Sequence, residues 1–191
     1  MDVTILLGRY GKTKHWEDYP PEYAKKFASF LKSRNFSGLL VDAGCGNGKD
    51  IALFNSEGFD ALGVDISEEE IKTAKAAFPN CKFEVQDIEN MTLKDEEVSA
   101  FFCVNTIYYT NQAKALGEFL RTLKKGGYLF IHFSIEVQDE EGNVDFIQKE
   151  EEIMPLLSKF KIAHQEIVER TDMVPEKHYH KIMEFVLQKP E

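Results

Sequence analysis

Three glycines at alternate positions, Gly44, Gly46 and Gly48, stand where an apolar run gives way to a helical pattern. The apolar run ends at Val41, and the helical pattern begins at Ile51. A strand, a tight glycine loop and a helix in this order predict the first βα turn of an open α/β sheet, where a nucleotide-like ligand binds. Glycine suits such a loop because it adopts positive φ and has no Cβ to hold a ligand away from the backbone.

The glycine spacing and the neighbouring acids narrow the class of ligand. A dinucleotide fingerprint would need glycine where Lys49 stands, and a phosphate-binding P-loop would need Ser or Thr where Asp50 stands. Asp42 and Asp50 put negative charge beside the loop, which repels phosphate and attracts a cation. We therefore expect adenosine with a charged, cationic tail, and an NAD-dependent oxidoreductase is the competing interpretation that the spacing disfavours.

Strands and helices alternate along the rest of the chain. Apolar runs predict strands over 39–42, 61–64, 82–85, 100–104 and 128–133. Helical spacing and capping signals predict helices over 21–33, 49–57, 68–77, 111–124 and 149–159. The polar stretch 138–143 predicts an exposed loop or lid, and the alternating stretches 162–170 and 181–188 predict an antiparallel hairpin. The fold class is α/β, with parallel strands first and an antiparallel pair at the end.

Four motifs carry a resemblance to a known family. The segment Asp42-Ala-Gly-Cys-Gly-Asn-Gly48 resembles the first motif, [DE]-x-G-x-G-x-G, of the class I S-adenosylmethionine-dependent methyltransferases. Gly63–Ser67 resembles the second motif, Gln86–Ile88 the third, and Lys125–Leu129 the stretch entering strand five. The resemblance spans about residues 37–135. It is strongest to the small-molecule enzymes of the tellurite-resistance and ubiquinone-biosynthesis type.

The resemblance implies a fold and a division of the chain. The family has a Rossmann-like, doubly wound, seven-stranded sheet of order 3-2-1-4-5-7-6, with helices on both faces. We expect a single domain over 1–191, in which 1–36 form an N-terminal lid and helix, 37–135 the cofactor-binding core, and 136–191 a C-terminal helix and β-hairpin. The implied cofactor is S-adenosyl-L-methionine.

The resemblance also implies a role for each motif residue on the methionine side of that cofactor. The loop glycines and Cys45 would pass beneath the methionine part, and Asp42 would accept hydrogen bonds near its amino group. Asn105, which follows strand four, would line the site near the methyl donor, or else bond only to backbone at the strand end.

On the adenosine side, acids end strands two and three. Asp65 would take both ribose hydroxyls, because a carboxylate accepts two O–H bonds at once. Ile66 would cover one face of adenine, and Asp87 would meet its exocyclic amine, with Ile88 alongside. The alternatives are that Asp65 is only a helix cap and Asp87 only a turn residue.

The acceptor is less determined by the sequence. Asn105-Thr-Ile-Tyr-Tyr109 lacks the prolines of the [ND]-P-P-[FY] motif, which argues against methylation of adenine N6 or a glutamine amide. His132, Tyr108 and His15 are candidate catalytic residues, each with ordinary packing as the alternative. A thiolate acceptor needs no general base, so the catalytic group stays open. No metal site is expected.

Composition restricts the partners. The 191-residue chain has a net charge of −10, which disfavours a nucleic-acid partner. No apolar run approaches the roughly 20 residues of a membrane helix, and the chain starts without a basic signal segment. We therefore expect a cytoplasmic monomer or homodimer that acts on a small-molecule acceptor, without a membrane partner. A non-catalytic binder of S-adenosylmethionine or a nucleotide, and methylation of RNA or protein, remain the alternatives.

Overall fold

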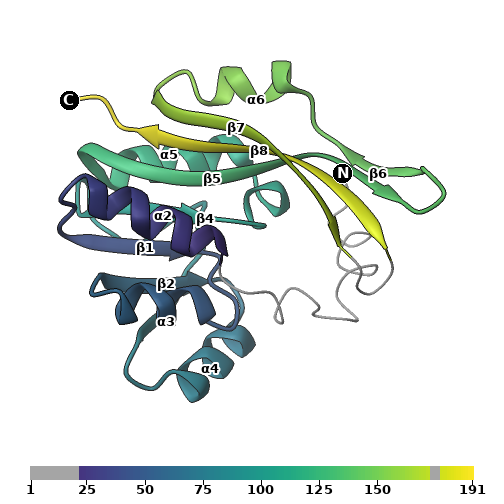
Figure 1. Ribbon diagram of the computed structural model, residues 1–191. Coiled ribbons are helices and arrows are strands. Elements are labelled where there is room, and N and C mark those ends of the chain that lie inside the picture. Colours follow the sequence, from purple (N-terminus) through teal and green to yellow (C-terminus); the bar gives the residue numbers. More distant parts are fainter. Residues whose placement is uncertain (1–21, 173–176) are drawn as a thin grey trace.

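Figure 1 shows the computed structural model, which describes residues 22–172 and 177–191. His15 and the expected N-terminal lid lie outside these residues. The elements in chain order are α2 (Glu22–Ser33), β1 (Leu39–Ala43), α3 (Lys49–Ser56), β2 (Asp60–Asp65), α4 (Glu68–Ala77), β3 (Lys82–Val85), β4 (Val98–Cys103), the 3-10 turn η2 (Ile107–Tyr109), α5 (Gln112–Thr122), β5 (Leu123–Asp139), β6 (Val144–Ile147), α6 (Glu150–Leu156), β7 (Lys161–Asp172) and β8 (His178–Gln188).

The strands form one sheet with the order β3-β2-β1-β4-β5-β8-β7. The first five pair in parallel, and β8 runs antiparallel to both β5 and β7. The predicted order 3-2-1-4-5-7-6 is therefore confirmed, because β8 and β7 are the seventh and sixth strands of that scheme.

One short strand was not predicted. Residues 138–143 do not form a long loop: β5 continues to Asp139, and β6 returns beside it as an antiparallel hairpin. The turn is held by Asp139, whose side chain accepts hydrogen bonds from the backbone N–H groups of Glu141 and Asn143, and by Gly142 at φ +85°. The polar stretch therefore forms the end of β5 and a tight turn within a β-hairpin.

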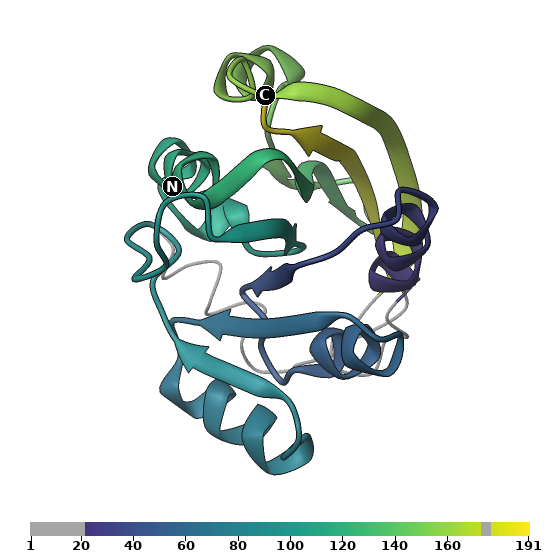
Figure 2. The same ribbon diagram turned by 90° about the vertical axis from the view of Figure 1, so that its left-hand side faces the viewer.

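The sheet has a separate apolar core on each face. Helices α2, α3 and α4 cover one face, and α5 and α6 cover the other (Figure 2). On the first face, the ring of Phe27 lies 6.1 Å from that of Phe102 and 5.2 Å from that of Phe130, centroid to centroid. Strands buried on both faces read as continuous apolar runs, which is why their positions could be predicted. Among the described helices, none has the length and apolar character needed to cross a bilayer.

Candidate functional site

The glycine loop joins β1 to α3 at the C-terminal edge of the parallel strands. Gly44, Gly46 and Gly48 have φ values of +86°, +49° and +83°, a region that side-chain-bearing residues rarely adopt. The N–H groups of Gly44 and Cys45 donate to the carbonyl of Val64, at 2.8 and 3.0 Å, so the loop is tied to β2. The predicted tight turn is therefore present, with Gly48 as the N-cap of α3.

Two of these glycines are also required by their neighbours. A Cβ at Gly44 would lie 2.2 Å from Oγ1 of Thr106, and one at Gly48 would lie 2.6 Å from the ring of Phe83. A Cβ at Gly46 would meet nothing within 4 Å. The middle of the loop therefore faces open space, whereas its two ends are packed against β3 and the segment after β4.

Three carboxyl groups gather at this loop. Asp42 is buried, and its Oδ2 has no hydrogen-bond partner among the described residues. Burial, followed by the charges of Asp50 and Asp65, raises the pKa of Asp42 well above its usual value. Burial also raises the pKa of Asp50 to about 6, although Lys49 acts in the opposite direction. A buried carboxylate beside other acids lacks a compensating positive charge, which a cationic ligand would supply.

Burial governs the thiol of Cys45 as well. It raises the pKa of Cys45, and the nearby charges of Asp42 and Asp65 raise it further. Only the thiolate is a strong nucleophile, so this cysteine is inert packing within the loop.

Asp65 lies across the loop at the end of β2. Its Oδ2 accepts from the N–H of Gly46 at 3.0 Å, and its Oδ1 accepts from the N–H of Ser67 at 2.9 Å. Each carboxylate oxygen can accept a second bond, so two hydroxyl groups still have acceptors here. Ser67, and not Asp65, caps α4, since its side chain accepts from the N–H of Glu70 at 3.2 Å. Next to Asp65, the side chain of Ile66 is 70% exposed, which is unusual for isoleucine.

The third strand brings Asp87 to the same edge, since the N–H of Gln86 donates to the carbonyl of Asp65 at 2.9 Å. Asp87 is exposed, and its Oδ1 accepts from the N–H of Glu89 at 2.8 Å. Ile88 is buried in the apolar core on the α5 face of the sheet.

Asn105 and Tyr108 meet just after β4. Asn105 adopts φ +57°, and the hydroxyl of Tyr108 donates to its Oδ1 at 3.3 Å. The adjacent Thr106 is the residue packed against Gly44. Asn105 and Tyr108 therefore lie on the segment that packs against the glycine loop through Thr106.

His132 lies further along the edge, on β5. It is 1% exposed, and its Nε2 lies 2.9 Å from Oε2 of Glu184, which is fully buried on β8. Lys26 of α2 contacts the other oxygen of Glu184 and also contacts Glu166 of β7. Sequence reasoning missed Glu184, although it is the one charged residue within the otherwise apolar stretch 182–187. A single charged residue in an otherwise apolar strand was therefore the sequence signal that could have identified it.

Two cavities, of about 210 and 170 Å³, lie away from the glycine loop. The larger is at the opposite edge of the sheet, beside Gly126 and Gly127, and the smaller lies between α2 and β8, beside Phe30 and His164. Neither borders the three acids, so the geometry of the acids and the open loop, and not cavity size, locates the candidate site.

Comparisons with known proteins identify the type of domain. Residues 41–131 match a family model described as "Methyltransferase domain". The chain is 32% identical over 110 residues to the tRNA (carboxymethyluridine(34)-5-O)-methyltransferase of Arabidopsis thaliana, covering 56% of this chain and 26% of that protein. It is 30% identical over 91 residues to the malonyl-[acyl-carrier protein] O-methyltransferase of Hamiltonella defensa, covering 47% and 35%. The chain thus spans less than half the length of these curated relatives.

Solved structures share the fold. A SAM-dependent methyltransferase of Methanosarcina mazei superimposes with a TM-score of 0.66 at 20% identity, covering 81% of this chain and 93% of that one. At this identity the likeness concerns the fold alone. Residues 41–131 therefore match the methyltransferase domain family, and the sheet has the fold of S-adenosylmethionine-dependent methyltransferases.

Proposed function

We propose that the protein transfers a methyl group from S-adenosylmethionine to a small-molecule acceptor. The matched domain and the fold support S-adenosylmethionine as the cofactor. The observation that carries the assignment to this site is the buried, unpartnered Oδ2 of Asp42 beside an open glycine loop. Bound there, the cofactor would supply a methyl group activated by a sulfonium charge.

The residues at the edge fit the parts of this cofactor. Asp42 would hold the amino group, and Gly44 to Gly48 would lie beneath the methionine part with Cys45 as packing. Asn105 would line the methyl side. On the other side Asp65 would accept from the ribose hydroxyls and Asp87 from the adenine amine. The exposed Ile66 would cover the ring, and Ile88 would support it from the core.

The small-molecule acceptor is supported by charge. The net charge of −10 opposes binding to a phosphate backbone. The finer subtype, close to the tellurite-resistance and ubiquinone-biosynthesis enzymes, belongs to the same proposal, and so does a cytoplasmic location for a chain whose three cysteines are free thiols. The oligomeric state stays a monomer or a homodimer.

RNA methylation is the second candidate because one relative acts on tRNA. A gel-shift titration with total tRNA at two salt concentrations separates the two. Micromolar binding that weakens steeply with salt would favour RNA, whereas the small-molecule proposal expects none. Cofactor binding without turnover on any acceptor would instead favour a non-catalytic binder.

Isothermal titration with S-adenosylhomocysteine tests the cofactor site. We expect micromolar binding and an affinity about 10²- to 10⁴-fold weaker in Asp65→Ala, because two hydrogen bonds to a charged acceptor, each worth about 1.5–3 kcal/mol, are lost together with the anchor of Gly46. Asp60→Ala, at the other end of β2, is the matched control and should change the affinity less than twofold. No binding at millimolar S-adenosylhomocysteine would overturn the proposed function.

A further inference from the structure

His132 occupies a defined place relative to the cofactor site. It is the first residue of β5 beyond those that pair with β4. Asp42 pairs with Phe102 and Phe102 with Phe130, so Asp42, Phe102, Phe130 and His132 all face α2. Two strand spacings and two residues along a strand put the Cα atoms of Asp42 and His132 about 12 Å apart. His132 therefore lies on the same edge and face as Asp42, on the side of β4 away from the adenosine residues.

The proton on the imidazole is placed by its neighbours. Hydrogen bonds from His132 and Lys26 outweigh burial and lower the pKa of Glu184, which is therefore an anion. Burial lowers the pKa of His132, so its ring is neutral at pH 7. A carboxylate only accepts hydrogen bonds, hence Nε2 of His132 carries the proton and donates it to Glu184. Nδ1 is left with a lone pair.

That lone pair meets no donor in the part of the chain that the structure describes. Nδ1 of His132 is buried and has no hydrogen-bond partner among the described residues. Leaving a buried polar atom unpaired costs about 1–3 kcal/mol, and such atoms in native proteins call for an explanation. An imidazole with one nitrogen held by a buried carboxylate and the other free to accept is the arrangement of a general base.

The first turn of α2 covers this imidazole. The ring of Tyr23 lies edge-on to it, with centroids 4.3 Å apart, and the Tyr23 hydroxyl accepts from Nη1 of Arg170 on β7 at 3.2 Å. An acceptor therefore reaches Nδ1 only when this turn shifts. The charged and titratable groups around His132 are Glu184 on β8, Arg170 on β7, and Lys26 and Tyr23 on α2.

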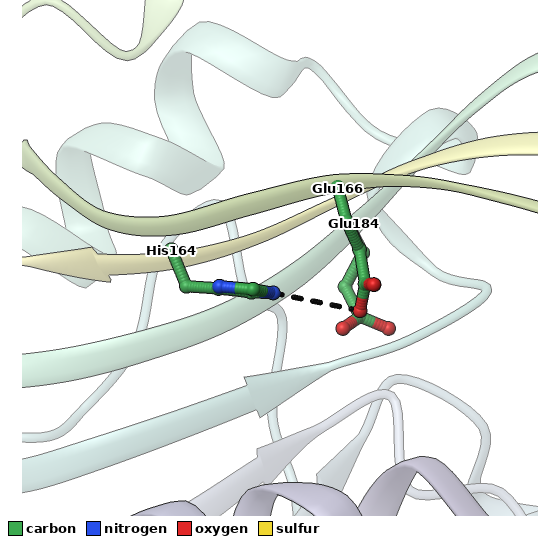
Figure 3. A group of neighbouring side chains, drawn as sticks. All are labelled: His164, Glu166 and Glu184. Atoms are coloured by element: carbon green, nitrogen blue, oxygen red, sulfur yellow. Dashed lines mark ion pairs between the residues drawn. The ribbon is translucent and has the colours of Figure 1, made fainter.

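A metal centre is the other use that this cluster suggests. Figure 3 shows His164, Glu166 and Glu184, whose ligand atoms all lie within 4.8 Å of one another. Glu166 and Glu184 are directly opposite in the β7–β8 register, where like charges repel. The ammonium of Lys26 contacts both carboxylates and supplies the required cation. The cluster thus fixes Glu184 in place behind His132, with no need for a metal ion.

We propose that His132 is the general base of the methyl transfer and that the acceptor reacts through a hydroxyl group. This rests on the proposed function. The acceptor oxygen forms a bond to the methyl carbon, the carbon–sulfur bond breaks, and its electron pair remains on sulfur. The hydroxyl proton passes to Nδ1 of His132, and the Glu184 carboxylate stabilises the resulting imidazolium. A thiolate acceptor has no proton to remove, so its methylation would not need His132 and Glu184.

Nuclear magnetic resonance of ¹⁵N-histidine-labelled protein tests the proton placement without any acceptor. We expect His132 as the Nε2–H tautomer, with a pKa below 6.5, in wild-type protein with and without S-adenosylhomocysteine. Glu184→Gln should lower this pKa further and mix the tautomers. An Nδ1–H tautomer in the wild type would overturn the proposal, as would a His132 that is protonated at pH 7.

Methyl transfer from labelled S-adenosylmethionine to matched phenols and thiophenols tests the role. In His132→Gln we expect a 10²- to 10⁴-fold slower methylation of phenols at pH 7, a loss that shrinks as pH approaches the phenol pKa, with thiophenol rates and S-adenosylhomocysteine affinity unchanged. His164→Gln, an exposed histidine of the same cluster, is the matched control.

The outcomes separate the two proposals. An equal loss for phenols and thiophenols, an undiminished phenol rate, or methylation of thiols alone would overturn the role of His132 while leaving the proposed function intact. Absent binding of S-adenosylhomocysteine to the wild type would overturn the function itself. If His132→Gln fails to fold, the ¹⁵N-histidine spectra of the wild type and of Glu184→Gln still test the proposed role of His132.

Discussion

At the scale of single residues, two effects disfavour the ionised form of the acids around the glycine loop. Asp42 is buried, with no hydrogen-bond partner for Oδ2 among the described residues, and the charges of Asp50 and Asp65 raise its pKa further. Asp50 has a pKa of about 6, against about 3.9 in an unfolded chain. Ionising these groups therefore costs folding stability as pH rises from about 4 to about 6, and a bound cation would offset that cost.

This linkage predicts the pH dependence of cofactor affinity. A cationic amino group binds the ionised acids, so below pH 6 binding must release a proton, and the dissociation constant of S-adenosylhomocysteine should rise by up to about tenfold per pH unit between pH 6 and 5. Calorimetric titrations at pH 5, 6 and 7, in buffers of different ionisation enthalpy, measure both affinity and proton release. Asp50→Asn should flatten the dependence, and an unchanged affinity from pH 7 to 5 in the wild type would contradict it.

At the scale of elements, the β1–α3 loop shows that three similar glycines serve different purposes. Gly44 and Gly48 are fixed by contacts with Thr106 and Phe83, whereas Gly46 has only its φ of +49° and an N–H bonded to Asp65. The loop therefore separates into packed ends that stabilise the fold and an open centre that would face the cofactor.

Paired substitutions test this separation. Gly44→Ala should lower the melting temperature by several degrees, because its Cβ would overlap Thr106 and its φ is +86°, a cost of about 2–3 kcal/mol. Gly46→Ala should cost about 1 kcal/mol but weaken S-adenosylhomocysteine binding at least tenfold, since its methyl group enters the open space.

Calorimetry gives the melting temperatures and titration gives the affinities. Adding Thr106→Ala to Gly44→Ala should restore part of the lost stability, because it removes two of the three atoms nearest the new Cβ. The opposite ranking, with Gly46→Ala the less stable and Gly44→Ala the weaker binder, would show that the loop is divided differently.

The sequence predicts those elements whose pattern lies within a short stretch of the chain, and it misses those that depend on pairing between distant strands. The strand bounds of β1 and β3 and the cap of α4 followed from apolar runs and Ser67. The β5–β6 hairpin was missed because residues 138–143, at the end of β5 and in the turn after it, are polar, which resembles a loop until the pairing of β5 with β6 and β8 is known. The proposed cofactor residues came from motifs whose own members lie within a few positions of one another.

The His132–Glu184 pair could not be predicted in this way. The two residues are 52 positions apart, and Lys26 is 158 positions from Glu184. Their meeting depends on the antiparallel register of β5 and β8, in which His132 pairs with Glu184, and on the docking of α2 over both strands. No local pattern specifies that register, so only the assembled sheet shows the pair.

At the scale of the whole molecule, β8 joins the C-terminal hairpin to the parallel part of the sheet. It lies between β5 and β7, and its residues alternate between the two cores: Phe185 packs on the α5 and α6 face, and Val186 on the α2 face. Among the described strands, edge strand β7 pairs with β8 alone. Strands of both halves of the chain therefore share continuous apolar layers, and we expect them to unfold together.

Phe185→Ala tests this cooperativity. Removing a fully buried phenylalanine should cost about 3–5 kcal/mol and lower the melting temperature by roughly 6–20 °C. If the chain unfolds as one unit, hydrogen exchange of the β1 amides should accelerate by the same factor as that of the β8 amides, on the order of 10³. Ile167→Ala, at a side chain that is 52% exposed on β7, is the control and should change stability by less than about 0.5 kcal/mol. Faster exchange confined to β7 and β8, with β1 unchanged, would mean that the C-terminal hairpin opens separately and that His132 loses its partner Glu184 without loss of the cofactor site.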